Sequence, residues 1–169
     1  MTNSIITVDY DGTIGDYFGG ESNPRKKIVR DWIKRLMRLG YDIHIVTRRY
    51  GPKSIYNTFG EYKSVLDFAD SVGITQENIH FTNRDWKFYT LQKLNSSIHL
   101  DDDIVEKQLI NQNAPSITAI CVEDVDWEQQ LKDRLSKNDG LKIWISSEKN
   151  LYNSLLILGI VLLILLITM

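Results

Sequence analysis

Two carboxylates stand two residues apart in the segment Asp9-Tyr10-Asp11-Gly12-Thr13, directly after the apolar run 5–8. The run predicts a buried strand, which places both carboxylates at the strand's carboxyl end, where open α/β sheets bind ligands. One carboxylate there can attack phosphorus and form an aspartyl-phosphate, while the second manages the leaving-group proton and a later water. The same segment is also compatible with a plain Asp-Gly turn followed by a helix-capping threonine.

Composition bounds the class of protein. The chain has 169 residues, is 43% hydrophobic and carries a formal net charge of −2. This is enough apolar material for one folded domain, and the charge is not that of a general polyanion binder. Nucleic acid is therefore not implied as a partner, although it stays open as a substrate. Cys121 is the only cysteine, which excludes internal disulfides and cysteine-rich zinc sites.

Strand and helix patterns alternate along the chain with short connections. We expect strands at 5–8, 41–47, 78–82, 97–100 and 117–122, and helices at 24–39, 53–72, 86–94, 104–110 and 126–135. Such alternation predicts an α/β fold, a Rossmann-like parallel sheet with helices on both faces in three layers. We divide the chain into a domain at residues 1–136, a linker or edge strand at 137–150 and a last segment at 151–169.

Further polar residues stand at the predicted strand ends. Thr47 ends the second strand, and Asp101-Asp102-Asp103 ends the fourth. A hydroxyl can hold a phosphoryl oxygen, and carboxylates facing Asp9 can complete the oxygen shell of Mg²⁺.

Two lysines and two arginines are candidates to neutralise a phosphoryl group. Lys87 and Lys93 both lie on the helix before the fourth strand; Lys87 is preferred because it lies in the first turn, nearest the active edge. Arg48 and Arg49 follow Thr47 and are suited to gripping a phosphate or carboxylate. Solvated loop arginines explain the same pattern.

Taken in order, the DYDGT segment, Thr47, Lys87 and the DDD cluster resemble the four motifs of the haloacid dehalogenase-like (HAD) phosphatase superfamily, over residues 4–125. The resemblance implies strand order 5-4-1-2-3, Asp9 as nucleophile and Asp11 as general acid/base. It implies that Thr47 and Lys87 bind phosphate, and we expect Gly12 and Arg48 to join them. For Mg²⁺ the expected ligands are Asp9, Asp11, Asp101 and Asp102. The short spacing between motifs leaves no room for a cap domain, which is typical of members that act on large or exposed phosphorylated substrates.

The segment 151–169 contains no charged residue. As a helix it is about 28 Å long, close to the roughly 30 Å of a bilayer's hydrocarbon core, and therefore predicts a transmembrane anchor. Lys142 and Lys149 precede it, which places the domain in the cytoplasm by the positive-inside rule. The resulting hypothesis is a membrane-tethered, Mg²⁺-dependent phosphomonoester hydrolase. The alternative is a non-catalytic HAD-like binding or anchoring module at a membrane.

Overall fold

The computed structural model describes residues 4–15, 23–57 and 60–139. The chain divides into two compact units, Met1–Trp127 and Glu128–Met169. The first unit contains a sheet, the helices that cover it and every candidate site residue, and the fold described below is that of this unit. Within the second unit the described residues belong to one helix, α5 (Trp127–Asp139).

The five-stranded sheet of the first unit is parallel throughout. It contains β1 (Ile5–Val8), β2 (Asp42–Thr47), β3 (Ile79–Phe81), β4 (Ile98–Asp101) and β5 (Thr118–Cys121). The strand order is β3-β2-β1-β4-β5, which reads 5-4-1-2-3 when counted from the β5 edge, the order that the resemblance implies. The central strand is β1, in which Val8 is in register with both Ile45 and Leu100.

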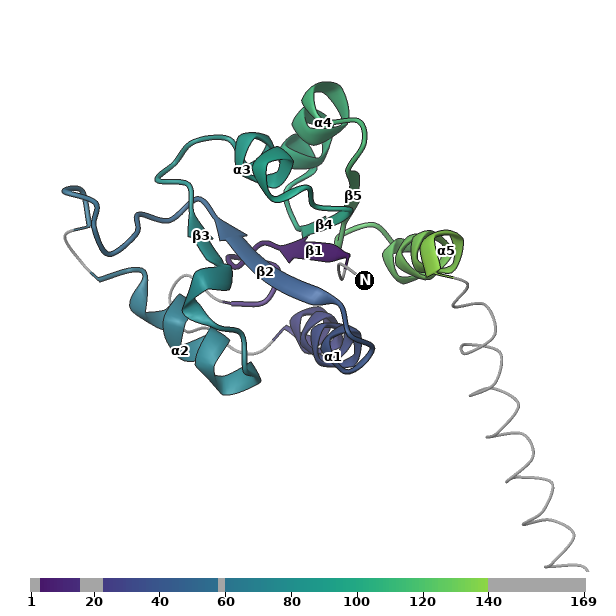
Figure 1. Ribbon diagram of the computed structural model, residues 1–169, viewed down its shortest axis with the longest axis horizontal. Helices are drawn as coiled ribbons and strands as arrows, with labels where there is room; N and C mark the ends of the chain where they lie inside the picture. Colours follow the sequence, from purple (N-terminus) through teal and green to yellow (C-terminus); the bar gives the residue numbers. More distant parts are fainter. Residues whose placement is uncertain (1–3, 16–22, 58–59, 140–169) are drawn as a thin grey trace, which may run out of the picture. The chain divides into compact units, whose positions relative to one another are not determined.

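Four helices cover the sheet. Helices α1 (Pro24–Arg38) and α2 (Lys63–Val72) lie on one face, and α3 (Lys87–Leu94) and α4 (Ile104–Asn113) lie on the other (Figure 1). The layering confirms the α/β class expected from the alternation of patterns. It follows from strands that are buried on both faces and therefore need two helical layers.

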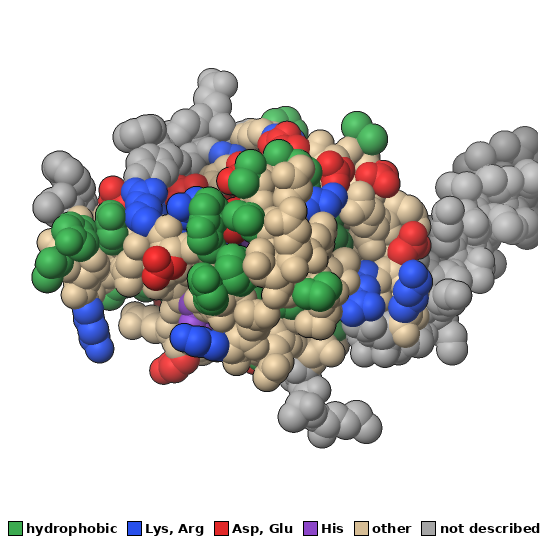
Figure 2. All heavy atoms as spheres, turned by 90° about the horizontal axis from the view of Figure 1, so that it is seen from above, with side chains coloured by type: hydrophobic (Ala, Val, Ile, Leu, Met, Phe, Trp, Pro, Cys, Tyr) green, Lys and Arg blue, Asp and Glu red, His purple; other side chains and the backbone are tan. Residues whose placement is uncertain are grey.

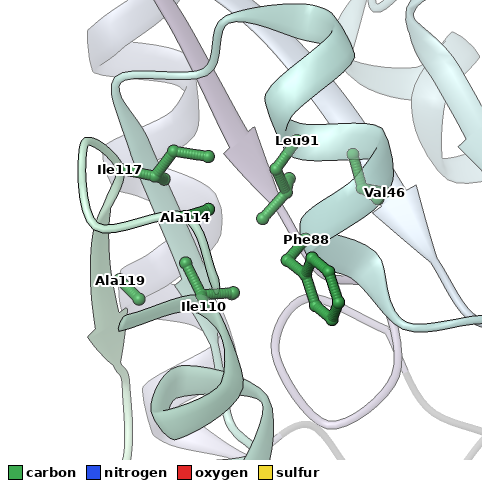
Figure 3. Close-up of a cluster of buried hydrophobic side chains, with 7 residues drawn as sticks. All are labelled: Val46, Phe88, Leu91, Ile110, Ala114, Ile117 and Ala119. Carbon is green, nitrogen blue, oxygen red and sulfur yellow. The ribbon is translucent and has the colours of Figure 1, made fainter. Parts of the chain in front are cut away.

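Apolar side chains between the sheet and helices α3 and α4 form a buried cluster (Figure 3). Phe88 and Leu91 enter it from α3, Ile110 from α4 and Val46 from β2. Each such side chain contributes roughly 1.5–3 kcal/mol through burial. The cluster fixes α3 against the sheet, and it thereby fixes the position of Lys87, the first residue of that helix.

Local signals in the sequence set the ends of several helices. Helix α1 begins at Pro24, after Asn23 caps it by accepting a hydrogen bond from the Arg25 N–H at 2.9 Å. It ends before Gly40, whose φ of +87° belongs to the left-handed region that glycine adopts readily. Asp103 caps α4 by accepting from the Val105 N–H at 2.8 Å.

The prediction of a helix over 53–72 was wrong in its first half, because α2 begins only at Lys63. The described residues between β2 and α2 form turns, in a stretch that contains Gly51, Pro52 and Gly60. Gly60 has a φ of +65°, which no helical residue adopts. Buried apolar residues of α2 occur only at Val65 and Ala69, so the helix begins where its apolar face begins.

The linker predicted from residue 137 was also wrong at its start, since α5 continues to Asp139. Among the described residues, no helix is both long enough and apolar enough to cross a bilayer. The predicted edge strand at 141–145 and the predicted transmembrane helix at 151–169 lie outside the described residues.

Candidate active site

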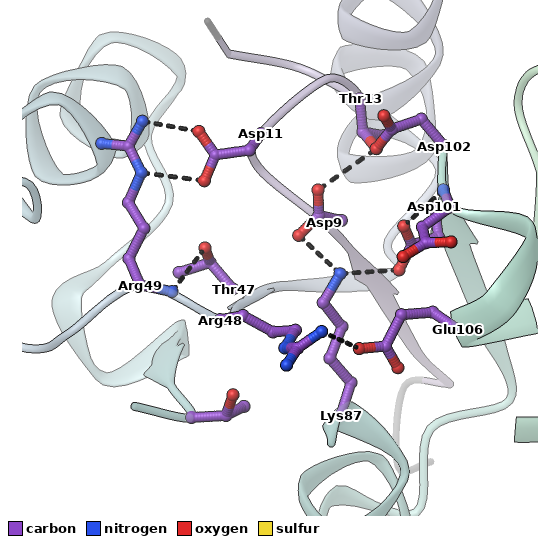
Figure 4. A network of polar contacts seen from close by, with 12 residues as sticks. Asp9, Asp11, Thr13, Thr47, Arg48, Arg49, Lys87, Asp101, Asp102 and Glu106 are labelled. Carbon is purple, nitrogen blue, oxygen red and sulfur yellow. Dashed lines mark hydrogen bonds and ion pairs between the residues drawn. The ribbon is translucent and has the colours of Figure 1, made fainter. Parts of the chain in front are cut away.

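Three strand ends bring their polar residues to the same edge of the sheet. Asp9 directly follows β1, and its backbone N–H donates to the Leu100 carbonyl of β4 at 2.8 Å. Thr47 is the last residue of β2 and Asp101 the last of β4. Because all three strands are parallel and neighbouring, their carboxyl ends meet, and Figure 4 shows the side chains converging there.

Lys87 lies at the centre of this group. Its Nζ is 2.7 Å from Asp9 Oδ1 and 2.7 Å from Asp101 Oδ2, and the residue is only 3% exposed. Lys93, at the other end of the same helix, is exposed. The structure therefore brings Lys87 into the site, and Lys93 is not among the residues around it.

Three carboxylates form a compact acidic cluster. Asp9, Asp101 and Asp102 each offer an oxygen, and these oxygens all lie within 4.8 Å of one another. The Thr13 hydroxyl joins two of them, since it donates to Asp102 Oδ1 at 2.9 Å and lies 3.4 Å from Asp9 Oδ2. Thr13 thus belongs to the site rather than serving only as a helix cap.

Gly12 lets the loop after β1 approach Asp102. Its φ is +78°, and a Cβ at this position would lie only 2.0 Å from Asp102 Oδ2. A side chain here meets both an unfavourable backbone conformation and a steric clash with the acidic cluster. Gly12 is therefore required for the closeness of the cluster.

The charge of the cluster is poorly compensated by the protein alone. Burial raises the pKa of Asp9 to about 8, against the opposing effect of Lys87. Burial likewise raises the pKa of Asp102. Asp101 is also buried, but Lys87 and the hydrogen bond from His99 outweigh this effect and lower its pKa.

One lysine therefore faces three carboxylates, two of which ionise at a cost. Clustered carboxylate oxygens are the donors that hard divalent cations prefer. The acidic residues consequently fit a bound cation, which would supply the missing positive charge.

Asp11, the second carboxylate of the opening segment, is held away from this cluster by Arg49. The guanidinium makes two parallel hydrogen bonds, Nε to Oδ2 at 2.8 Å and Nη2 to Oδ1 at 2.6 Å. Its remaining nitrogen, Nη1, donates to Ser64 Oγ at 2.7 Å and to the Glu61 carbonyl, and Tyr10 lies below the guanidinium plane. The Asp11 side chain therefore contacts Arg49 rather than the acidic cluster, and its expected place among the metal ligands stays a prediction.

Arg48 and Glu106 form a second charged pair at the rim. Arg48 Nη1 is 3.7 Å from Glu106 Oε1, its Nη2 donates to the Arg84 carbonyl at 3.0 Å, and its guanidinium lies over the Trp86 ring. Glu106 is 1% exposed, and burial raises the pKa of its carboxyl. Arg48 therefore reaches the site as expected, while Glu106, in the first turn of α4, joins it without having been predicted.

These residues line a pocket of about 210 Å³. Its carboxylates come from the ends of β1 and β4 and from α4, and its guanidinium groups from the ends of β2 and β3. The lining residues are Asp9, Asp11, Arg48, Arg49, Arg84, Lys87, Asp101, Asp102, Asp103 and Glu106. Thr47, which is fully buried, lies behind the pocket and accepts a hydrogen bond from the Arg49 N–H at 3.3 Å.

A buried chain of hydrogen bonds supports Asp101 from below. His99 Nε2 lies 3.0 Å from Asp101 Oδ2, and His99 Nδ1 lies 2.9 Å from the Thr7 hydroxyl. Burial lowers the pKa of His99 despite the nearby Asp101, so a neutral imidazole that donates from Nε2 fits best. His99 therefore orients a site carboxylate from within the core. The available signal was polar residues at Thr7 and His99 in neighbouring, otherwise apolar strands.

Neither models of known protein families nor curated proteins match this sequence. The site is therefore interpreted from its own chemistry.

Proposed function

We propose that this chain is a Mg²⁺-dependent phosphomonoester hydrolase that works through an aspartyl-phosphate on Asp9. The observation that carries the proposal is the position of Asp9. It is a buried carboxylate at the end of the central strand, within 2.7 Å of Lys87 and within 4.8 Å of two further carboxylates. A nucleophile, a cation for the transferring group and a set of oxygen ligands thus occupy one pocket.

In the first half-reaction, an oxygen of Asp9 attacks phosphorus and forms a P–O bond while the bond to the leaving oxygen breaks. Asp11 gives a proton to that oxygen. In the second half-reaction, Asp11 takes a proton from a water that attacks phosphorus, the bond to Asp9 breaks, and inorganic phosphate and free Asp9 result. Lys87 offsets negative charge on the phosphoryl oxygens throughout.

The contact between Asp11 and Arg49 fits the second half-reaction. A carboxylate that accepts two hydrogen bonds from a guanidinium is in the form that receives a proton. Proton donation in the first half-reaction requires Asp11 to leave Arg49, take up a proton from solvent and turn toward the leaving group. Asp11 is 28% exposed, so its side chain has room for this movement.

Asp9, Asp101 and Asp102 would hold Mg²⁺, and the bound cation would supply positive charge for the phosphoryl oxygens. We favour Mg²⁺ because it takes oxygen ligands and usually binds substrate phosphate and water beside its carboxylate ligands. The substrate class is a phosphate monoester on a large or exposed group, because the pocket is not covered by a separate cap domain in the part of the chain that the structure describes.

Release of phosphate from a panel of phosphomonoesters by the full-length chain, with Mg²⁺ or with chelator, tests the proposal. We expect Mg²⁺-dependent release, and accumulation of phosphate on Asp9 that mass spectrometry locates after rapid quenching. Asp9→Asn is expected to abolish both phosphate release and the phosphorylated residue. Asp70→Asn makes the same change at an exposed position of α2 and is expected to alter neither. Binding of phosphate without any hydrolysis across the panel would instead support the non-catalytic module.

A further inference from the structure

A second and larger hollow of about 800 Å³ adjoins the catalytic pocket. It is formed by the loop after β2, which was predicted to be helical from residue 53 onward, together with the edge strand β3. The lining residues are Tyr50, Gly51, Pro52, Lys53, Ser54, Ile55, Tyr56, Ile79, His80, Phe81, Asn83 and Thr90. We call this hollow the β3 groove.

The β3 groove and the catalytic pocket share their walls. Arg49 lines the pocket and the next residue, Tyr50, lines the groove; Arg84 lines the pocket and the preceding residue, Asn83, lines the groove. The two loops are joined by a hydrogen bond from the Gly51 N–H to Asn83 Oδ1 at 2.9 Å. The Arg84 guanidinium lies 5.3 Å from the centre of the Tyr50 ring. The two hollows are therefore lined by consecutive residues of the same two loops.

The wall itself has an unusual backbone. Asn83 and Arg84 both have positive φ, 55° and 75°, in succession and without glycine. Their N–H groups donate to the carbonyls of Arg49, at 3.2 Å, and of Arg48, at 2.9 Å, which hold this conformation in place. Strained residues that a structure holds firmly are found preferentially at ligand sites. Here the turn places one side chain in the groove and the next in the pocket.

The chemistry of the groove favours a planar, partly polar ligand. The rings of Tyr50 and Tyr56 lie 5.6 Å apart, and Tyr56 is 66% exposed. Ser54, Asn83 and His80 also line the groove, and none of the described lining residues is acidic. The exposed face of the Tyr56 ring offers a surface for stacking beside these polar side chains. A nucleobase fits such a surface, because it stacks through its face and forms hydrogen bonds through its edge.

Surface charge and exposure agree with this occupant. The Lys53 side chain of the groove and the arginines of the adjoining pocket suit a ligand that carries phosphate. Seen from the side of α3 and α4, the surface carries hydrophobic side chains interspersed with charged ones (Figure 2). Ile55, next to Tyr56, is 86% exposed, so the loop offers apolar surface for contact rather than burying it.

We propose that the β3 groove binds the nucleoside part of a phosphomonoester, so that the substrate of the catalytic pocket is a nucleotide. This inference rests on the proposed function for the reaction, but the binding of the nucleoside does not require turnover. The shared chemistry is one nucleobase attached to one phosphate. A free nucleotide and the phosphorylated end of a nucleic acid strand both supply it.

The test compares AMP with ribose 5-phosphate, which has the same phosphate and sugar but no base. For the full-length chain we expect Tyr56→Ala to reduce kcat/KM for AMP roughly 5- to 100-fold, the loss that one aromatic stacking partner causes. The rate with ribose 5-phosphate should not change, and Tyr56→Phe should keep the wild-type rate with AMP. Tyr89→Ala is the matched control, since Tyr89 is 56% exposed on α3 and does not line the groove.

Binding measurements separate this inference from the proposed function. Calorimetric titration of AMP into the Asp9→Asn full-length chain should show binding that Tyr56→Ala weakens by the same factor. If no variant or wild-type chain hydrolyses any phosphomonoester but this binding is observed, the inference stands and the proposed function fails. If ribose 5-phosphate and AMP are hydrolysed equally well and Tyr56→Ala changes neither, the inference is overturned while the phosphatase stands.

Two further arms complete the test. A short oligonucleotide with a terminal phosphate distinguishes a polynucleotide end from free AMP: preference for either one supports the proposal and names the source. Light scattering addresses a different occupant, a second copy of the chain. The proposal would be overturned if the chain forms a dimer that Ile55→Asp dissociates and if Tyr56→Ala leaves AMP binding unchanged. These two results together would show that the groove is a subunit interface.

Discussion

Asp9→Asn is expected to stabilise the metal-free protein while abolishing its activity. Burial raises the pKa of Asp9 from 3.8 to about 8, so holding this carboxylate ionised at pH 7.5 costs free energy. At about 1.4 kcal/mol per pKa unit the cost has an upper limit of roughly 5 kcal/mol, and relaxation around the site reduces it to about 2–4 kcal/mol. The asparagine oxygen can still accept from Lys87 Nζ, and its NH₂ group can donate to Thr13 Oγ1.

The assay is thermal unfolding in chelator, in which a gain of about 2–4 kcal/mol corresponds to an increase in Tm of roughly 5–15 °C. The gain should depend on pH. The raised pKa means that the folded state holds the proton more tightly than the unfolded state does. Wild-type stability therefore falls, relative to the variant, as pH rises from 3.8 to about 8. Between pH 5.5 and 7.5 the difference between the two proteins should grow by at most about 3 kcal/mol, the limit set by one proton over two pH units.

Addition of Mg²⁺ should reverse the order of stability. The cation supplies charge to the ionised cluster, so it should raise the Tm of the wild type and have little effect on the variant. An Asp9→Asn protein that is less stable than wild type in chelator, with a difference that does not change with pH, would refute the reasoning about the uncompensated cluster. Retained turnover would refute the role of Asp9 as nucleophile. Asp70→Asn, at an exposed position, should behave as wild type in every arm.

Four further predictions test other parts of the site and the tail. Lys87→Met should abolish turnover and lower the free energy of unfolding by about 3–5 kcal/mol in chelator, with partial recovery in Mg²⁺. Lys93→Met is the control and should change neither denaturant unfolding nor rate. Gly12→Ala should raise the Mg²⁺ concentration needed for half-maximal rate, because the added Cβ clashes with Asp102. Gly40→Ala is the control: its φ is similarly positive but nothing lies within 4 Å of the added Cβ, so it should cost only roughly 1–2 kcal/mol of backbone strain. Equal Mg²⁺ requirements for the two variants would contradict the clash. Arg49→Lys should lose about 1–3 kcal/mol of stability and slow turnover, because one ammonium cannot replace the bidentate contact with Asp11. An unchanged pH–rate profile would argue against a role of Arg49 in positioning Asp11. Ile160→Arg should release the full-length chain from membranes in carbonate extraction, because inserting the arginine into the bilayer costs roughly 2.5–3.5 kcal/mol. A wild-type chain that does not pellet with membranes would contradict the predicted transmembrane anchor.

The parts of the site that are fixed by strand ends could be predicted from the sequence. Apolar runs locate the strands, and in a parallel sheet the residues that follow neighbouring strands must meet, so Asp9, Thr47 and Asp101 were placed together correctly. Lys87 was predicted for the same reason, as the first-turn residue of a helix whose start lies at this edge.

Residues whose role depends on a partner distant in sequence could not be predicted in the same way. The pairing of Asp11 with Arg49 spans 38 positions, and nothing in either local segment indicates it. Arg49 had an equally plausible interpretation as a solvated loop residue, yet it is 3% exposed. The helix predicted over 53–72 also failed in its first half, because periodicity late in the segment was extended back across Gly60 into the loop that forms the β3 groove.

The site is built as two opposed charged walls that neutralise one another only in part. Arg48 contacts Glu106, Arg49 contacts Asp11, and Lys87 is shared between Asp9 and Asp101. A phosphate dianion that enters the pocket needs positive charge, and the guanidinium groups can provide it only by weakening their contacts with carboxylates. The released Asp11, once it has taken a proton from solvent, would then be free to protonate the leaving group. Substrate binding and the freeing of the general acid/base are thus coupled through Arg49 in the proposed reaction, because the same guanidinium serves both anions.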